Sequence, residues 1–250
     1  MISEKEIAKE FSGLWDDVLP LLTPQFVGLF NAANSDDLID YPKSKFNKIP
    51  IGHNVEKHDL VAELSFQVAK LSIERNIPVK SINGGTKDFR DAYHNSVAFL
   101  RKYVSEDEKV LLNPDEISEA FSLAMQYEYF FPHVKARNIE FSPRIAGAGY
   151  LGACYADLSV DDTLYEVKTV SRNIAGKDIK QLILYLALQH STGTRRWLHA
   201  GFFNPRKSIH YKFSVDHLIY RTSGGRSASE VFADIVDFLS TRGIEIDAIF

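Results

Sequence analysis

The stretch from Gly152 to Gln189 places the strongest constraint on the fold of this chain, because it combines two extended segments, a tight turn and an amphipathic helix. Apolar and polar residues alternate along 155–160 and 163–170, and two aspartates between these runs mark a turn. The next apolar run, 177–191, has the period of a helix. The stretch therefore predicts a β-hairpin that is followed directly by a helix.

Five polar or charged side chains of this stretch are expected to meet. Glu166 and Lys168 are two apart on an extended run and so share one face of it. Asp157 lies on the preceding run, across the predicted hairpin. Gln181 and Tyr185 are four apart and share one side of the helix. The pattern predicts that Asp157, Glu166 and Lys168 converge at the end of a two-stranded ribbon, with the other two nearby.

These residue types suit metal-assisted phosphodiester cleavage. A divalent ion must bind phosphate oxygens and lower the pKa of an attacking water, and Mg²⁺ takes carboxylates together with waters and phosphate oxygens. Asp157 and Glu166 supply two carboxylates, and Val167 adds a backbone carbonyl between Glu166 and Lys168. Lys168 is placed to orient the water or to offset charge that develops on the phosphate.

A plainer alternative is a cross-strand ion pair on a solvated sheet surface. Asp157, however, stands between Ala156 and Leu158 in an apolar run, where an unpaired carboxylate is costly. This position favours the metal site. For Gln181 and Tyr185, a polar edge on a buried helix is nearly as good an explanation as contact with a substrate.

The chain resembles the PD-(D/E)XK phosphodiesterase (restriction-endonuclease-like) superfamily over about residues 113–215. Its segment AD-LSVDDTLYEVK matches the Asp, hairpin and Glu-x-Lys signature at Asp157, Glu166 and Lys168, and Gln181 to Tyr185 resembles the QxxxY motif of the RecB-like branch. The resemblance implies an α/β fold with a core of helix, three-stranded meander, helix and strand. It also implies that the QxxxY residues contact nucleic acid.

The resemblance implies further site residues and a cofactor. Members often carry an additional metal-binding acid on the first core helix, where Glu119 is the better candidate and Glu128 the second. The cofactor would be Mg²⁺ or Mn²⁺. Two departures are visible: Ala156 stands in place of the proline of the signature, which many members also lack, and the cysteines of the iron–sulfur members are absent.

The charge distribution fits a polyanionic substrate. The net charge is −4, yet residues 167–226 carry 11 Lys and Arg against two Asp, whereas residues 1–166 carry 17 against 26 acids. Since phosphate contacts supply most nucleic-acid affinity, Arg172, Lys177 and Lys180 are expected to bind DNA beside the site. The alternative is a solvated surface whose counter-charges come from the acidic half of the chain.

The remaining elements are predicted from periodicity and breaker residues. Residues 1–110 form a mostly helical extension and residues 111–250 the nuclease-like core. The predicted helices are 3–34, broken at Pro20 and Pro24, and 57–75, 87–104, 113–131, 177–191 and 227–242, the last with Gly243 as its C-cap. The predicted strands are 77–82, 139–145, 155–160, 163–170, 197–203 and 210–213, and 35–56 is expected to be a surface loop.

Composition excludes several classes of protein. A single cysteine, Cys154, rules out an internal disulfide and any cysteine cage for a metal. No membrane span or signal peptide is visible, so a cytoplasmic location is expected. His53 and His58 are five apart without a second ligand pair, and the other histidines are expected to be structural or exposed.

The sequence thus predicts a Mg²⁺-dependent deoxyribonuclease, and the resemblance suggests a role in phage defence, restriction or DNA repair. The first alternative is a catalytically silent scaffold or nucleic-acid-binding subunit of a larger complex. A structure-specific RNA endonuclease is a weaker one, since no aromatic single-strand platform is visible. The N-terminal helical region is expected to read the target or bind a protein partner, and association into a homo-oligomer stays open.

Overall fold

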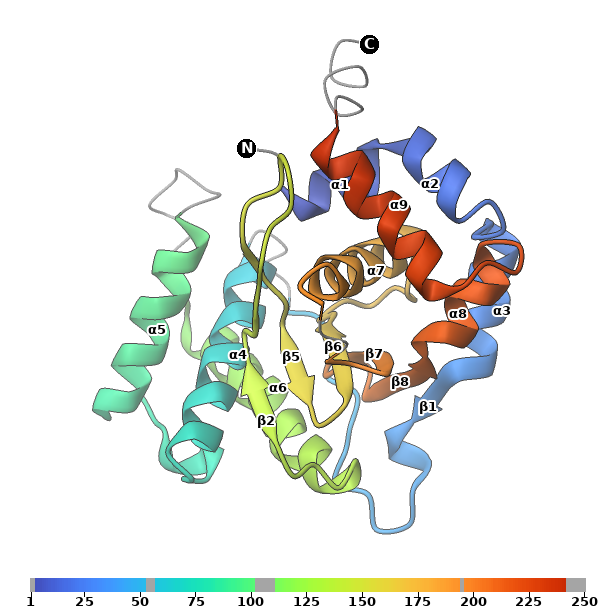
Figure 1. The fold of residues 1–250 in the computed structure, drawn as a ribbon. Coiled ribbons are helices and arrows are strands. Elements are labelled where there is room, and N and C mark those ends of the chain that lie inside the picture. The colour runs from blue at the N-terminus through green and yellow to red at the C-terminus, as the bar shows by residue number, and fades with distance from the viewer. Residues whose placement is uncertain (1–2, 53–56, 102–110, 194–195, 242–250) are drawn as a thin grey trace.

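A computed structural model describes residues 3–52, 57–101, 111–193 and 196–241. A mixed six-stranded sheet with the order β1-β8-β7-β6-β5-β2 forms its centre, and helices cover both faces (Figure 1). The predicted α/β class is therefore confirmed. The strands are β1 (Ser35–Asp37), β2 (Ile139–Phe141), β5 (Leu158–Val160), β6 (Thr163–Val167), β7 (His199–Asn204) and β8 (Ile209–Ser214).

The strand pairing in the sheet changes from antiparallel to parallel between β6 and β7. Strands β2, β5 and β6 form an antiparallel meander, and α7 (Gly176–His190) then carries the chain to β7, which runs parallel to β6. Preceded by α6 (Pro114–His133), this is the predicted order of helix, three strands, helix and strand. Strands β6 and β7 consequently end at the same edge of the sheet.

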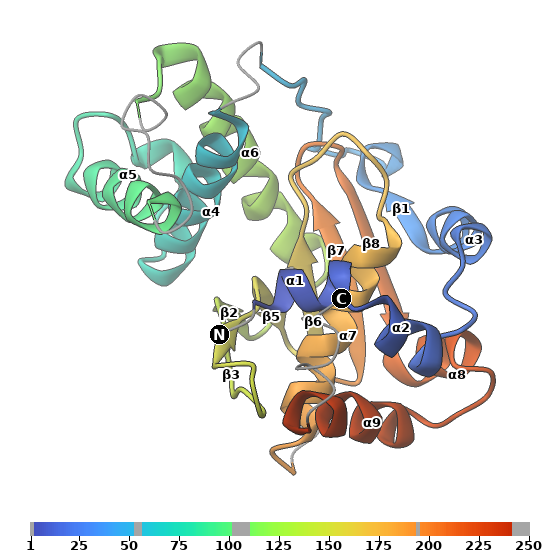
Figure 2. The same cartoon turned by 90° about the horizontal axis from the view of Figure 1, so that it is seen from above.

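Two hydrophobic cores lie on opposite faces of the sheet. Leu164 belongs to the core beneath α7, whereas Tyr165 and Val167 belong to the core beneath α6, as the predicted alternation requires. Figure 2 shows the two groups of helices on either side. One comprises α4 (His58–Glu74), α5 (Lys87–Leu100) and α6; the other comprises α1 (Glu4–Glu10), α2 (Ser12–Val18), α3 (Pro24–Asn34), α7, α8 (Val215–Thr222) and α9 (Ala228–Ser240).

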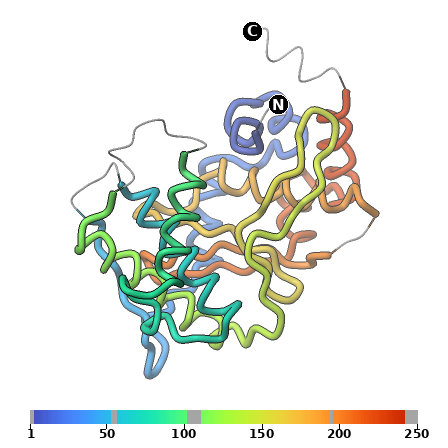
Figure 3. The backbone as a smooth tube through the Cα atoms, turned by 90° about the vertical axis from the view of Figure 1, so that its left-hand side faces the viewer, coloured from blue at the N-terminus to red at the C-terminus, as the bar shows by residue number. Residues whose placement is uncertain are grey.

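The predicted strands 139–145 and 155–160 are each interrupted. Ser142 has a positive φ of 53° and Pro143 has no N–H to donate, so the first run divides into β2 and β3 (Arg144–Ile145). The second divides into β4 (Cys154–Tyr155) and β5. The β3–β4 arm leaves the sheet and extends toward α1 and the end of α9 (Figure 3). At Gly149 the φ is 54° and an added Cβ would collide with the backbone of Leu239.

Two expectations for the first half of the chain were wrong, and one helix of the second half, α8, was not expected. The segment 35–56 is not only a loop, since β1 pairs with the otherwise open edge of β8 and a 3₁₀ helix, Leu38–Asp40, follows it. The run 77–82 is a 3₁₀ helix at Val79–Ser81, not a strand, with Ser81 N–H donating back to the Pro78 carbonyl.

The long helices lie close to their predicted positions. Asn113 caps α6 and accepts the Glu116 N–H, with Pro114 in the first turn. This helix continues through Pro132 to His133, so the predicted end at Phe131 was too early. The 3–34 run divides into α1, α2 and α3, and Pro24 starts α3. The predicted helix end at Val104 and the Gly243 cap lie outside the described residues.

The first 110 residues contribute β1 to the sheet and helices to both cores, and the predicted division at 110/111 stays a prediction. In the part of the chain that the structure describes, no helix is both long and apolar enough to cross a membrane.

Candidate active site

The hairpin β5–β6 brings Asp157 and Glu166 opposite each other. Leu158 pairs with Tyr165, so the preceding residue on β5 faces the following residue on β6. Asp157 was expected inside a strand, but it lies at a bend between β4 and β5. There its Oδ2 accepts the Val167 N–H at 2.7 Å, which holds the carboxylate at the end of the ribbon.

Lys168 follows the end of β6 and points back to Glu166. Its Nζ donates to Glu166 Oε1 at 2.9 Å and to Gln181 Oε1 at 3.1 Å, and it lies 3.8 Å from Asp178 Oδ1. Strand β6 was expected to reach Val170. It ends three residues earlier, and Lys168 N–H still donates to the Phe203 carbonyl.

The motif residues of α7 join this network. Gln181 Nε2 donates to Tyr185 Oη at 3.0 Å, and Tyr185 in turn donates to Glu4 Oε1 at 3.5 Å. Both side chains are buried. Gln181 positions the Lys168 ammonium, and Tyr185 holds Gln181. A direct contact of either residue with a substrate stays a prediction.

Burial controls the electrostatics of the two carboxylates. Burial raises the pKa of Asp157, against the opposing effects of Lys168 and the Val167 N–H. Burial and the charge of Asp157 raise the pKa of Glu166 to about 7. For Lys168, burial would lower the pKa, but Glu166 and Asp157 outweigh it and the pKa is raised. One lysine is therefore shared by two desolvated carboxyl groups.

One oxygen of this cluster is not satisfied. Glu166 is 3% exposed, and among the described residues its Oε2 has no hydrogen-bond partner. A buried carboxylate oxygen without a partner is costly, and a hard cation held by oxygen ligands would satisfy it. Asp157 is only half-buried, so the cluster keeps a route to solvent. The residues present fit a divalent ion.

Sequence reasoning missed three neighbours. Glu63 on α4 raises the pKa of Asp157, and Lys5 on α1 lowers the pKa of both Asp157 and Glu166. Glu4 is the partner of Tyr185. These residues are 94 or more positions away in sequence from Asp157, and no local motif marks them. The N-terminal region thus contributes charged groups to the site itself.

Asp178 was also missed, although it lies two residues after the first residue of α7. It accepts from Arg172 Nη2 at 3.0 Å and from the Ala175 N–H at 2.8 Å, and these bonds, against burial, lower its pKa. Arg172 is thereby tied to the site and not free for a substrate. Lys177 is exposed beside it.

Two other predicted residues have partners away from the trio of Asp157, Glu166 and Lys168. Lys180 lies 5.7 Å above the Trp15 ring, and burial lowers its pKa. Glu119, the predicted additional metal ligand, forms a buried ion pair with Arg206, Oε1 to Nη2 2.7 Å. Metal binding by Glu119 would require this pair to open. The position of the Val167 carbonyl as a metal ligand stays a prediction.

Much of the basic block carries counter-charges from elsewhere. Arg196 pairs with Glu140, Lys212 with Asp162, and Arg226 with Asp234. This is the pattern that the solvated-surface alternative predicts. The basic residues left for an anionic ligand near the site are accordingly few, and Lys177 is the clearest of them.

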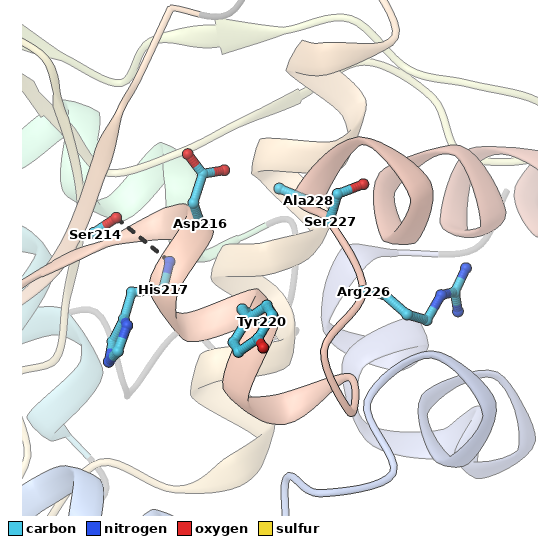
Figure 4. A pocket seen from close by; sticks show the side chains of 7 residues that line it. All are labelled: Ser214, Asp216, His217, Tyr220, Arg226, Ser227 and Ala228. Carbon is cyan, nitrogen blue, oxygen red and sulfur yellow. Dashed lines mark hydrogen bonds between the residues drawn. The ribbon is translucent and has the colours of Figure 1, made fainter.

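A shallow pocket lies elsewhere, between α8 and α9 (Figure 4). It contains none of the predicted site residues. Its lining comprises Ser214, Asp216, His217, Tyr220, Arg226, Ser227 and Ala228.

No family model, curated protein or solved structure matches this chain. The assignment of a function therefore rests on the geometry of the trio and its surroundings.

Proposed function

We propose that this protein is a divalent-cation-dependent nuclease that hydrolyses phosphodiester bonds of DNA, built on a restriction-endonuclease-like core. One observation carries the proposal: Asp157 and Glu166 face each other, share Lys168, and leave Glu166 Oε2 buried without a partner among the described residues. Such a cluster has an excess of negative charge that a cation would balance.

The residues would divide the work as follows. Asp157 and Glu166 would hold Mg²⁺ or Mn²⁺, which when bound acts as a Lewis acid and activates water. Lys168, fixed by Glu166 and Gln181, would orient the attacking water and offset charge on the phosphate. Gln181 and Tyr185 would keep the Lys168 ammonium in place, and Val167 would fix Asp157 through its N–H.

The choice of DNA is supported by the same resemblance and by the position of basic residues. Lys177 lies exposed at the start of α7, one residue before Asp178 of the network. A helix N-terminus and a lysine both favour an anionic backbone. Asp157 is half-buried, and a scissile phosphate would approach from its side of the cluster.

Cleavage assays test the proposal directly. Supercoiled plasmid, linear duplex, single-stranded DNA and RNA would be incubated with the protein and Mg²⁺ or Mn²⁺, alongside an EDTA control. The wild type should cut DNA only with metal, and Lys168→Met should lose about 10²–10⁴-fold in rate, the range for a positioned proton-transfer or charge-stabilising group. Lys80→Ala, which changes an exposed lysine of the 3₁₀ helix, is the matched control.

Three results would decide between the alternatives. Undiminished cleavage by Lys168→Met would refute the assignment of the site. Cleavage of RNA alone would replace DNA by RNA as the substrate. Metal binding without cleavage of any substrate would favour the scaffold or a subunit that needs a partner.

A further inference from the structure

A second cluster of ligating side chains lies on the opposite face of the sheet from Glu166. Asp36 on β1, His133 at the end of α6 and His210 on β8 each offer one ligand atom, and these atoms lie within 4.8 Å of one another. No local pattern marks this cluster, because Asp36 and His133 are 97 positions apart along the chain and His133 and His210 are 77 apart. The pairing of β1 with β8 brings Asp36 to His210, and the packing of α6 on this face of the sheet brings His133 to both.

Register separates this cluster from the candidate active site. Val167 pairs with Phe203, Phe203 with His210, and His210 with Asp36, so the four form one row across the sheet. Asp36 is thus three strands from β6, roughly 14 Å at the usual strand spacing. His210 also contacts Phe130 of α6, whereas Leu164, two residues before Glu166, packs beneath α7.

A second observation points to a ligand here. His210 is 9% exposed, and its Nδ1 is buried with no hydrogen-bond partner among the described residues. That nitrogen lies 3.5 Å from Asp36 Oδ2. In a tetrahedral zinc site with bonds near 2.0–2.1 Å, neighbouring ligand atoms are about 3.3 Å apart. The two atoms already have nearly the spacing of ligands to one ion.

The remaining groups complete such a site. The His133 ring lies 5.7 Å from the His210 ring, centroid to centroid, and is half-buried at a helix end, so a small rotation would bring its nitrogen inward. Tyr41 donates to Asp36 Oδ2 at 2.8 Å and orients the carboxylate, as partners of metal ligands commonly do. Lys212, the nearest cation on β8, is exposed and pairs with Asp162.

We infer that Asp36, His133 and His210 form a binding site for a zinc-class transition-metal ion. Two imidazoles and one carboxylate suit Zn²⁺, with water in the fourth position, and not Mg²⁺, which prefers oxygen ligands. A bound ion would join β1, α6 and β8 and so fasten the N-terminal strand to the sheet. This inference does not depend on the proposed nuclease activity.

Calorimetric titration of the tag-free, metal-free chain with ZnCl₂ tests the inference, with the visible absorption of bound Co²⁺ as a second readout of imidazole ligation. The wild type should bind one Zn²⁺ at this site and unfold at a higher temperature when loaded. His133→Ala and Asp36→Asn should bind more than about 100-fold more weakly, and Tyr41→Phe about 10-fold more weakly. His217→Ala, which removes an exposed histidine, should bind as the wild type does.

Asp157→Asn distinguishes the two sites, since it should leave this Zn²⁺ binding intact. Circular dichroism establishes that each variant is folded, and Tyr41→Phe retains all three ligands if His133→Ala is unstable. Absence of Zn²⁺ binding by the wild type would overturn the inference. So would equal binding by folded His133→Ala, or loss of binding in Asp157→Asn with retention in His133→Ala.

Discussion

Two buried carboxylates are each paired with a cation that follows the end of a parallel strand, Lys168 after β6 and Arg206 after β7, and the two pairs differ in charge balance. Glu119 and Arg206 form one carboxylate with one guanidinium, and Arg206 also donates to the Pro50 carbonyl at 2.9 Å. Glu166 and Lys168 form the other, but there Asp157 also depends on the lysine, and Asp178, which is paired with Arg172, lies 3.8 Å from it.

The difference separates a structural pair from a binding site. A balanced ion pair in the interior carries no excess charge, and removing either partner leaves an uncompensated charge. A cluster in which carboxylates outnumber cations is unfavourable until another cation arrives. Burial alone therefore does not identify a functional acid; the count of charges around it does.

The largest expected effect concerns the unbalanced cluster. Lys168→Met should reduce DNA cleavage about 10²–10⁴-fold, because the lysine is placed to act on the water or the phosphate. Rates should be measured at saturating Mg²⁺ so that a change in metal affinity does not mask the effect. A loss of less than about 10-fold, well below that range, would show that Lys168 only balances charge.

The balanced pair should respond in stability and not in chemistry. Arg206→Met should lower the free energy of unfolding by about 3–5 kcal/mol, because it leaves Glu119 buried and unpaired. Urea denaturation measures this, and Arg226→Ala, which breaks an exposed pair with Asp234, should cost no more than about 1 kcal/mol. Equal small effects would remove the contrast between the two pairs.

The pH dependence of stability should reveal the cost of burying the ionised Glu166 carboxylate. Its pKa of about 7 in the folded chain lies above the ordinary value of 4.5, so the folded state holds this proton more tightly than the unfolded state. The stability due to this group is full below pH 4.5 and is lost as the pH rises through about 7. Glu166→Gln should therefore stabilise the metal-free protein by about 1–3 kcal/mol at pH 8.

Thermal or urea denaturation at several pH values measures this difference, which should shrink toward pH 5. Asp17→Asn, which changes an exposed aspartate of α2, is the control. A pH-independent difference would mean that burial does not raise the pKa of Glu166.

The smallest expected effect is on DNA affinity. Lys177→Ala should weaken binding to all sequences alike and reduce the slope of log affinity against log salt by about 1, as for the loss of one phosphate contact. Filter binding or fluorescence anisotropy at several salt concentrations would measure it. An unchanged slope would place the DNA elsewhere on the surface.

Local pattern accounts for the parts of the molecule that the sequence predicts well. Alternation in 163–167 places Leu164 and Tyr165 on opposite faces, and hairpin spacing brings Asp157 opposite Glu166. The Asn113 cap and the α7 period likewise depend only on neighbouring residues. Residues that are close together in the sequence, within one helix or one hairpin, are enough to specify these features.

Non-local contacts account for what the sequence does not reveal. Strand β1 has three residues and exists because β8 offers an open edge. Glu63 and Lys5 reach the site through tertiary packing of α4 and α1, and Glu119 is engaged by Arg206 from the β7–β8 turn. No spacing within the sequence indicates these partners.

Calorimetric titration with Mn²⁺ shows whether Asp157 and Glu166 hold a divalent ion. Wild type, Glu166→Gln and Asp157→Asn would be compared at pH 8, with Asp162→Asn as the control and with the zinc-class cluster removed by His133→Ala in every chain. We expect the wild-type site and the Asp162→Asn control to bind Mn²⁺. Glu166→Gln and Asp157→Asn should both lose this binding. Equal Mn²⁺ binding in all four chains would show that the two carboxylates do not form a metal site.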